Sequence, residues 1–254
     1  MEKRNIIQML AKKVAPNWLG RQLILRRSLA ACPGFTKADL DRCAAEFLDG
    51  PVGIGFRNFP LPLEIEERRK SHGSSKYFDF DYWLRVNILR AVALGLNSGS
   101  RKRVLDLGCG PGWFLAVCKF HAHEVNGFDL PYCDMCKEDG GVYMQLNRML
   151  GVDKDIRRGR ISSFSPLRVD GKFDVITAFM VCFNNHKSEQ TWKAEQWKFF
   201  LEDIKGHLKA GGTFRMELNP DQRSYPKFKY YDTETKEIFR QFGNVQGSTI
   251  TLSL

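Results

Sequence analysis

The chain has 254 residues, of which 43% are hydrophobic and 27% are charged. This composition excludes a disordered chain and is sufficient for a full hydrophobic core. No apolar run reaches the ~18 residues that a membrane-spanning helix needs, and the N-terminus lacks the apolar core of a secretion signal, so we expect a cytoplasmic protein. Seven cysteines, an odd number without regular spacing, indicate reduced thiols rather than a disulfide framework.

The net charge of +10 is distributed unevenly along the chain. Residues 1–105 carry 19 Lys and Arg against 10 Asp and Glu, which gives +9, whereas residues 106–254 carry 20 against 19, which gives +1. The basic character is thus assigned to an N-terminal extension. Such an excess can attract nucleic acid, anionic lipid or acidic substrates, although it more often describes only a solvated face.

Helices are expected through most of this extension. Segments 4–14 and 17–31 mix basic and apolar residues on either side of Pro16, a pattern typical of helices that lie on membranes or RNA or pack against a catalytic domain. Thr36 and Asp39 have the spacing of a capping box and predict a third helix.

Gly50 and Pro51 are expected to end that third helix. Residues 51–75 are rich in Gly, Pro and charged residues, and the tract 71–75 predicts a mobile connection. Residues 79–96 predict a further helix that leads into the first strand of a sheet.

The organising stretch is 104–115, which reads VLDLGCGPGWFL. Its apolar start predicts a buried strand, and Gly108, Gly110 and Gly112 predict a tight turn into a helix that begins near Trp113. Bare N–H groups at a helix N-terminus form a nucleotide-binding turn. In the dinucleotide fingerprint G-x-G-x-x-G the third glycine falls where Trp113 stands here, which argues against NAD.

An acid, Asp106, precedes the first glycine by two residues. The resulting D-x-G-x-G-x-G motif resembles the first motif of the class I S-adenosylmethionine-dependent methyltransferases. Further segments match in the same order: 124–130 (EVNGFDL), 173–179 (FDVITAF) and 208–218 (LKAGGTFRMEL) are similar to the second, fourth and fifth strands of that family. The resemblance implies an α/β fold with a doubly wound, mostly parallel sheet.

The resemblance also implies a binding site for S-adenosylmethionine. Asp129, at the end of the second strand, is expected to hold the ribose hydroxyls, because a carboxylate accepts two hydrogen bonds. The third strand is expected at 157–161, and the residues that follow it contact adenine in related enzymes. The expected cofactor-binding residues are Asp106, Gly108, Cys109, Gly110, Gly112, Asp129, Leu130, Ile161, Ser162 and Phe179.

Substrates are expected beyond the fourth strand, where the chain continues with Asn184, Asn185 and His186. The Asp/Asn-Pro-Pro-aromatic tetrad of many amide and nucleobase N-methyltransferases is absent here, which disfavours those acceptors. His186 is the candidate catalytic residue, because imidazole can remove a hydroxyl proton near neutral pH. Equally, His186 and Asn184 can be turn residues before the next helix.

Two residues of the extension are candidates for the substrate site. In similar methyltransferases the segment before the first strand often closes over cofactor and substrate, so Tyr77 and Arg85, from an aromatic-rich stretch, could line a pocket. Core packing explains the same aromatic cluster equally well.

A zinc site made of His121, His123, Cys133 and Cys136 is disfavoured. The histidines precede the second strand and the cysteines follow it, so an extended strand separates the two pairs by roughly 20 Å. We therefore expect no metal.

The C-terminal third predicts helices at 191–209 and 233–242 and strands at 213–218 and 245–252. The resembling family ends in an antiparallel pair of strands, whereas one clear strand is visible here, so a shortened end is expected. We predict a basic helical cap at 1–100 and a methyltransferase domain at 101–254, acting on oxygen or an amine of a small or medium organic molecule. RNA or protein methylation, and cofactor binding without methyl transfer, are the alternatives. The sequence does not indicate an oligomeric state.

Overall fold

The computed structural model describes residues 17–58, 75–134, 137–220 and 229–254. The chain consists of two compact units, Met1–Gly99 and Ser100–Leu254. Among the described residues, no helix is both long and apolar enough to cross a bilayer. The predicted helix at 4–14 lies outside the described residues.

The first unit consists of helices. They are α2 (Asn17–Ala30), α3 (Lys37–Asp49), α4 (Pro51–Asn58), the short 3-10 helix η1 (Ser75–Phe78) and α6 (Phe80–Val92). The predicted capping box of α3 is confirmed: the Asp39 backbone N–H donates to the Thr36 hydroxyl, while the Asp39 carboxylate accepts from the Thr36 N–H. Asp79 caps α6 by accepting from the Tyr82 N–H.

Two features of this unit differ from expectation. No helix was predicted after Gly50, yet α4 begins at Pro51; proline suits the first position of a helix, where its fixed φ fits and its missing N–H is not needed. Residues 59–74 lie outside the described part. In α2, Leu25 is buried whereas Leu23 and Ile24 are exposed, so the apolar residues do not form one face of an amphipathic helix.

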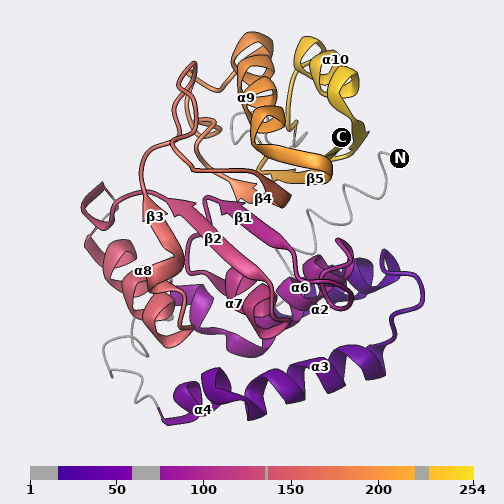
Figure 1. The fold of residues 1–254 in the computed structure, drawn as a ribbon, viewed down its shortest axis with the longest axis vertical. Coiled ribbons are helices and arrows are strands. Elements are labelled where there is room, and N and C mark those ends of the chain that lie inside the picture. Colours follow the sequence, from indigo (N-terminus) through magenta and orange to yellow (C-terminus); the bar gives the residue numbers. More distant parts are fainter. Residues whose placement is uncertain (1–16, 59–74, 135–136, 221–228) are drawn as a thin grey trace. The chain divides into compact units, whose positions relative to one another are not determined.

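The second unit is built on one seven-stranded sheet with the order β3-β2-β1-β4-β5-β7-β6 (Figure 1). The strands are β1 (Arg103–Leu107), β2 (Glu124–Asp129), β3 (Ile156–Arg158), β4 (Phe173–Val181), β5 (Leu208–Leu218), β6 (Asn244–Gln246) and β7 (Thr249–Ser253). The pairings from β3 to β5 are parallel, and β7 is antiparallel to both neighbours. The predicted doubly wound, mostly parallel fold is confirmed.

Helices cover the two faces of this sheet. In Figure 1, α7 (Trp113–Phe120) and α8 (Lys137–Met149) lie on one side, and α9 (Ala194–His207) and α10 (Thr233–Phe242) on the other. The core beneath α9 contains Trp197, Phe200 and Phe214, all almost fully buried. This apolar layer fixes the strand ends from which the site is built.

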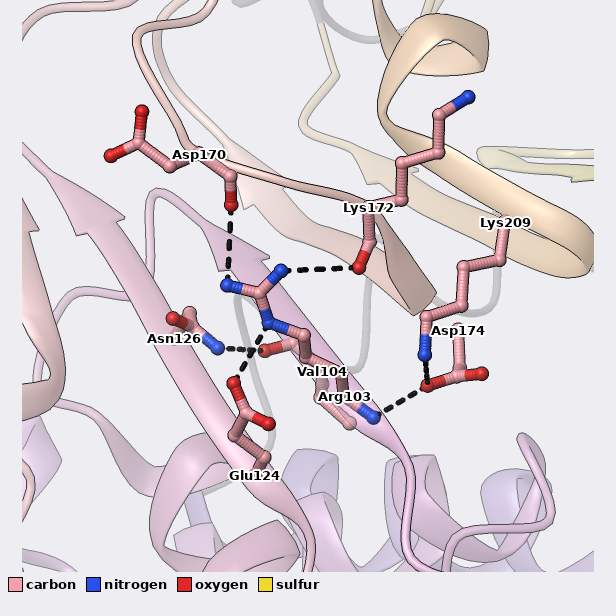
Figure 2. A network of polar contacts seen from close by, with 8 residues as sticks. All are labelled: Arg103, Val104, Glu124, Asn126, Asp170, Lys172, Asp174 and Lys209. Carbon is pink, nitrogen blue, oxygen red and sulfur yellow. Dashed lines mark hydrogen bonds and ion pairs between the residues drawn. The ribbon is translucent and has the colours of Figure 1, made fainter.

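A polar network ties the strands together at their amino ends (Figure 2). The Arg103 guanidinium donates to the Asp170 and Lys172 carbonyls at 3.2 and 3.3 Å and pairs with Glu124 at 2.8 Å. Gly171, between the two carbonyls, has φ +82°, and a Cβ there would lie 2.3 Å from the Arg103 Nη1. Arg103 therefore holds the start of β4 and the loop before it against β1 and β2.

The C-terminal end is not shortened, contrary to expectation. Residues 244–253 form a hairpin of β6 and β7, joined by a two-residue turn at Gly247 and Ser248. Gly247 has φ +59°, a value that two-residue hairpin turns need and that glycine adopts without strain. The prediction of one strand missed the turn because a single glycine divides an otherwise continuous β-rich run.

Candidate cofactor and substrate site

The glycine loop joins β1 to α7 at the carboxyl end of the sheet. Gly108, Gly110 and Gly112 all have positive φ, at +68°, +53° and +81°. The Gly108 N–H donates to the Phe128 carbonyl at 2.7 Å, which fixes the start of the loop to the end of β2. Such backbone angles strain any other residue, so the loop needs glycines for its shape.

The glycines serve two different purposes. A Cβ on Gly108 would meet the Phe183 ring at 4.0 Å, and one on Gly110 would meet the Tyr143 ring at 3.9 Å; both are ordinary van der Waals distances, so neither glycine is tightly packed. A Cβ on Gly112 would lie 2.6 Å from the Val152 Cγ2 and 2.9 Å from the Asn147 Nδ2. Gly108 and Gly110 thus leave room for a ligand, whereas Gly112 allows close packing.

Asp129 ends β2 directly beside this loop. Its carboxylate accepts the Gly110 N–H at 2.6 Å and the Leu130 N–H at 2.8 Å. A carboxylate has about four lone-pair positions, so two stay available to further donors. Burial raises the pKa of Asp129 above its ordinary value, against the opposing effects of the Leu130 N–H, Arg158 and the Gly110 N–H. Hydroxyl donors from a ligand would therefore stabilise a carboxylate that is short of solvation.

Asp106 and Cys109, also expected at the cofactor site, point into protein. Asp106 is 4% exposed, and one of its oxygens accepts the Thr177 hydroxyl of β4 at 2.7 Å. The Cys109 thiol is buried, and its sulfur would lie 2.9 Å from a Cβ on Gly127. Burial raises the pKa of Cys109 well above its ordinary value, so the thiol stays protonated at neutral pH. Their side chains join the strands and support the loop.

Asn147 of α8 supports the loop from the other side, a role that the sequence reading missed. It is fully buried; its Nδ2 donates to the Gly110 carbonyl at 3.1 Å, and its Oδ1 accepts from Arg158 at 2.7 Å and from the Tyr132 hydroxyl at 2.9 Å. Arg158 also lies 3.9 Å over the Tyr132 ring and donates to the Leu130 carbonyl. One feature of the sequence could have indicated this role: Asn147 is a polar residue between Leu146 and Leu150 on the apolar side of a helix.

Ile161 and Ser162, the predicted adenine contacts, do not directly follow β3 as expected, because this strand is shorter than predicted. The strand ends at Arg158 rather than at 161; the Gly159 N–H makes a last hydrogen bond to the Asp129 carbonyl of β2, and the chain then leaves the sheet. Ile161 is buried in the core beneath α9, and Ser162 follows it. Their contact with adenine stays a prediction.

The predicted cofactor residue Phe179 lies in β4, and the predicted substrate-side residues follow that strand. The Phe179 ring packs on Phe114 of α7 at 5.0 Å. Phe183 lies over the glycine loop, with its Cδ1 4.0 Å from the Cβ position of Gly108. Asn184 and His186, only 1% and 4% exposed, come next in a loop closed by a hydrogen bond from the Trp192 N–H to the Asn184 carbonyl. The structure thus places the end of β4 beside the glycine loop.

Tyr77 and Arg85 belong to the first unit. The Tyr77 ring packs on Trp83 at 4.8 Å. Arg85 pairs with Asp81 at 2.7 Å and with Asp41 of α3. Burial lowers the pKa of Arg85, but the hydrogen bonds with Asp81 and Asp41 outweigh it and raise that pKa overall. These contacts join α3 to α6, and a substrate role for either residue stays a prediction.

The residues of the disfavoured zinc site have other contacts. The His123 Nδ1 accepts the Lys102 N–H at 3.1 Å, before β2. Cys136 lies outside the described residues. In the described ranges, no group of three or more His, Cys, Asp or Glu side chains is placed to hold a metal ion.

A comparison with protein families decides the assignment. The family described as "Methyltransferase domain" matches residues 80–226, more than half of the chain. The chain belongs to this methyltransferase family. The predicted methyltransferase family is thereby confirmed. No curated protein sequence matches the chain.

Solved structures with a similar arrangement include further methyltransferases. The glycopeptide N-methyltransferase MtfA is 16% identical with a TM-score of 0.39, and the match spans 56% of either chain. DesVI of Streptomyces venezuelae is 16% identical with a TM-score of 0.43, over 61% of either chain. An S-adenosylmethionine-dependent methyltransferase of Clostridium acetobutylicum is 20% identical with a TM-score of 0.40, over 62% of this chain and 57% of its own. Likenesses this low carry no inference about the substrate.

The residues present fit the methyltransferase cofactor. Gly108 is exposed, and neither Gly108 nor Gly110 is tightly packed, which suits a ligand that approaches the loop closely. The spare lone pairs of Asp129 suit a ribose diol. Both features face the carboxyl end of the sheet, where open α/β folds bind their ligands.

Proposed function

We propose that this methyltransferase acts on an oxygen or amine of a small or medium organic molecule, held at the carboxyl end of β4. The cofactor, when bound, supplies the electrophilic methyl group. We propose that Gly108, Gly110 and Asp129 hold its nucleoside part, with further contacts from the remaining residues predicted from the sequence.

The observation that carries the acceptor site is the side chain of Asn184. Its Oδ1 is buried and accepts no hydrogen bond from any described residue. A buried carbonyl oxygen without a donor costs about 1–3 kcal/mol. A hydroxyl or amine that donates to this oxygen would remove the cost, so the site favours a ligand with an O–H or N–H group. Phe183, the preceding residue, already contacts the glycine loop, which supports a place for Asn184 near the methyl group.

The protein's own tasks in such a reaction are few. Asn184 would orient the acceptor by its hydrogen bond, and His186 would take the proton that the acceptor loses. The low exposure of both side chains keeps bulk water away from the attacking atom. An amine that is already deprotonated would need alignment alone.

Incubation with S-adenosylmethionine labelled in its methyl group and fractionated lysate tests the acceptor class. We expect label in small molecules, and markedly less label with the Asp129→Ala variant as the matched control. Label confined to RNA or to protein would contradict the proposed acceptor class while leaving methyl transfer itself intact.

A further inference from the structure

Strand β3 and the segment that joins it to β4 carry a concentration of positive charge that the balance of +1 over residues 106–254 conceals. Residues 156–172 contain four arginines and one lysine against one aspartate, which gives +4. In the described chain this crossover contains no helix. Ile161 and Leu167 anchor it in the core beneath α9, and the Leu167 N–H donates to Asp203 of α9 at 2.8 Å.

A hollow of about 400 Å³ lies along this segment. Its eight lining residues include all four arginines, together with Gly159 and Ser165, and none is acidic. Arginine offers a planar fork of donors that fits phosphate oxygens, and a serine hydroxyl can donate as well. The lining thus offers donors and positive charge without a carboxylate to balance them.

Three of these arginines have weak partners or none, whereas Arg158 is held by Asn147, Tyr132 and the Leu130 carbonyl. Arg157 pairs at 3.0 Å with Asp170, whose side chain is 96% exposed, and Arg160 lies 3.3 Å from Asp134 on the surface. Arg168 is exposed, and its side chain has no hydrogen bond or ion pair with a described residue. Exposed ion pairs contribute little, so a phosphate dianion would displace them readily.

An exposed aromatic ring lies next to the hollow in sequence. Phe164 directly precedes the lining residue Ser165, is 58% exposed and has φ +56°, a value that is rare for a bulky residue. Backbone strain of this kind concentrates at binding and catalytic sites. Arginines beside an exposed aromatic ring are typical of surfaces that bind nucleotides or single strands.

We propose that the hollow along residues 157–168 is a phosphate-binding site. It takes the phosphate groups of a nucleotide or of a nucleic-acid strand, with Phe164 as an apolar surface for the organic part. In the strand order, β3 is three positions from β4, about 14 Å at the usual strand spacing. The site is therefore distinct from the acceptor position at Asn184, and the inference does not rest on the proposed function.

The test uses the full chain saturated with S-adenosylhomocysteine, so that the cofactor site is closed. Pyrophosphate and a 12-residue single-stranded oligonucleotide are titrated into the wild type and into the Arg157→Ala, Arg160→Ala, Arg168→Ala triple variant. A second triple variant, Lys198→Ala, Lys236→Ala, Arg240→Ala, removes the same charge from α9 and α10 and serves as the control.

We expect the arginine triple variant to bind pyrophosphate at least tenfold more weakly, and the control variant to bind it as the wild type does. If the natural source is a nucleic-acid strand, oligonucleotide binding falls as well, and its log–log salt slope becomes shallower by roughly 2, at about 0.7 for each lost phosphate contact. Equal binding of both probes by the two triple variants, or no binding of either probe to the wild type, would overturn the proposal.

Discussion

Replacing Gly112 with alanine should lower the stability of the protein by about 2–5 kcal/mol. Part of this cost is backbone strain, since φ +81° costs a residue with a Cβ roughly 1–2 kcal/mol. The rest is overpacking, because the added Cβ would lie 2.6 Å from Val152 and 2.9 Å from Asn147, and forced repacking costs roughly 1–3 kcal/mol. Denaturant unfolding measures the difference.

Gly110→Ala is the matched control for this prediction. Its φ of +53° brings similar strain, but the new Cβ would meet nothing closer than 3.9 Å. We expect a smaller loss of stability, about 1–2 kcal/mol, together with weaker cofactor binding, because that methyl group enters the ligand's side of the loop. Equal losses of stability in both variants would contradict the distinction between packing and ligand-facing glycines.

Replacing His186 with glutamine should slow the chemical step roughly 10²- to 10⁴-fold, if this imidazole takes the acceptor's proton. Glutamine is close to histidine in size and keeps hydrogen-bonding capacity, which limits damage at a site that is only 4% exposed. Single-turnover methyl transfer across pH, with an identified acceptor, measures the step directly.

His207→Gln is the control for the histidine prediction. His207 ends α9 and lies 3.8 Å from Asp203, at the amino end of β5 and not at the carboxyl ends of the strands. Both variants should keep the cofactor affinity of the wild type. A wild-type rate for His186→Gln at every pH would remove His186 as the base and would point to an amine acceptor or to another base such as Tyr77.

The parts of the fold that are specified locally could be predicted from the sequence. The capping box at Thr36, the glycine turn before Trp113 and the acid at the end of β2 each depend on residues close together in the chain. The sheet order follows from the matched family pattern, because parallel strands with right-handed crossovers permit few arrangements. Helix α4 was missed because Pro51 both stops one helix and starts the next.

Features that depend on tertiary packing could not be predicted in this way. Asn147 lies 37 residues after Gly110, and only the folded chain brings its amide to the loop carbonyl. The four arginines in and after β3 were hidden by the nearly neutral total of residues 106–254, and they line one hollow along a segment that contains no helix. Long-range contacts of single polar residues leave little periodic signal.

The central claim is that the glycine loop and Asp129 together bind the methyltransferase cofactor. Titration calorimetry with S-adenosylhomocysteine, on the wild type and on Asp129→Ala, tests it most directly. The variant should bind about tenfold to a hundredfold more weakly, which corresponds to roughly 1.5–3 kcal/mol from lost charge-assisted hydrogen bonds, and NADH should not bind to either protein. Unchanged affinity in Asp129→Ala, or tight binding of NADH by the wild type, would contradict the claim.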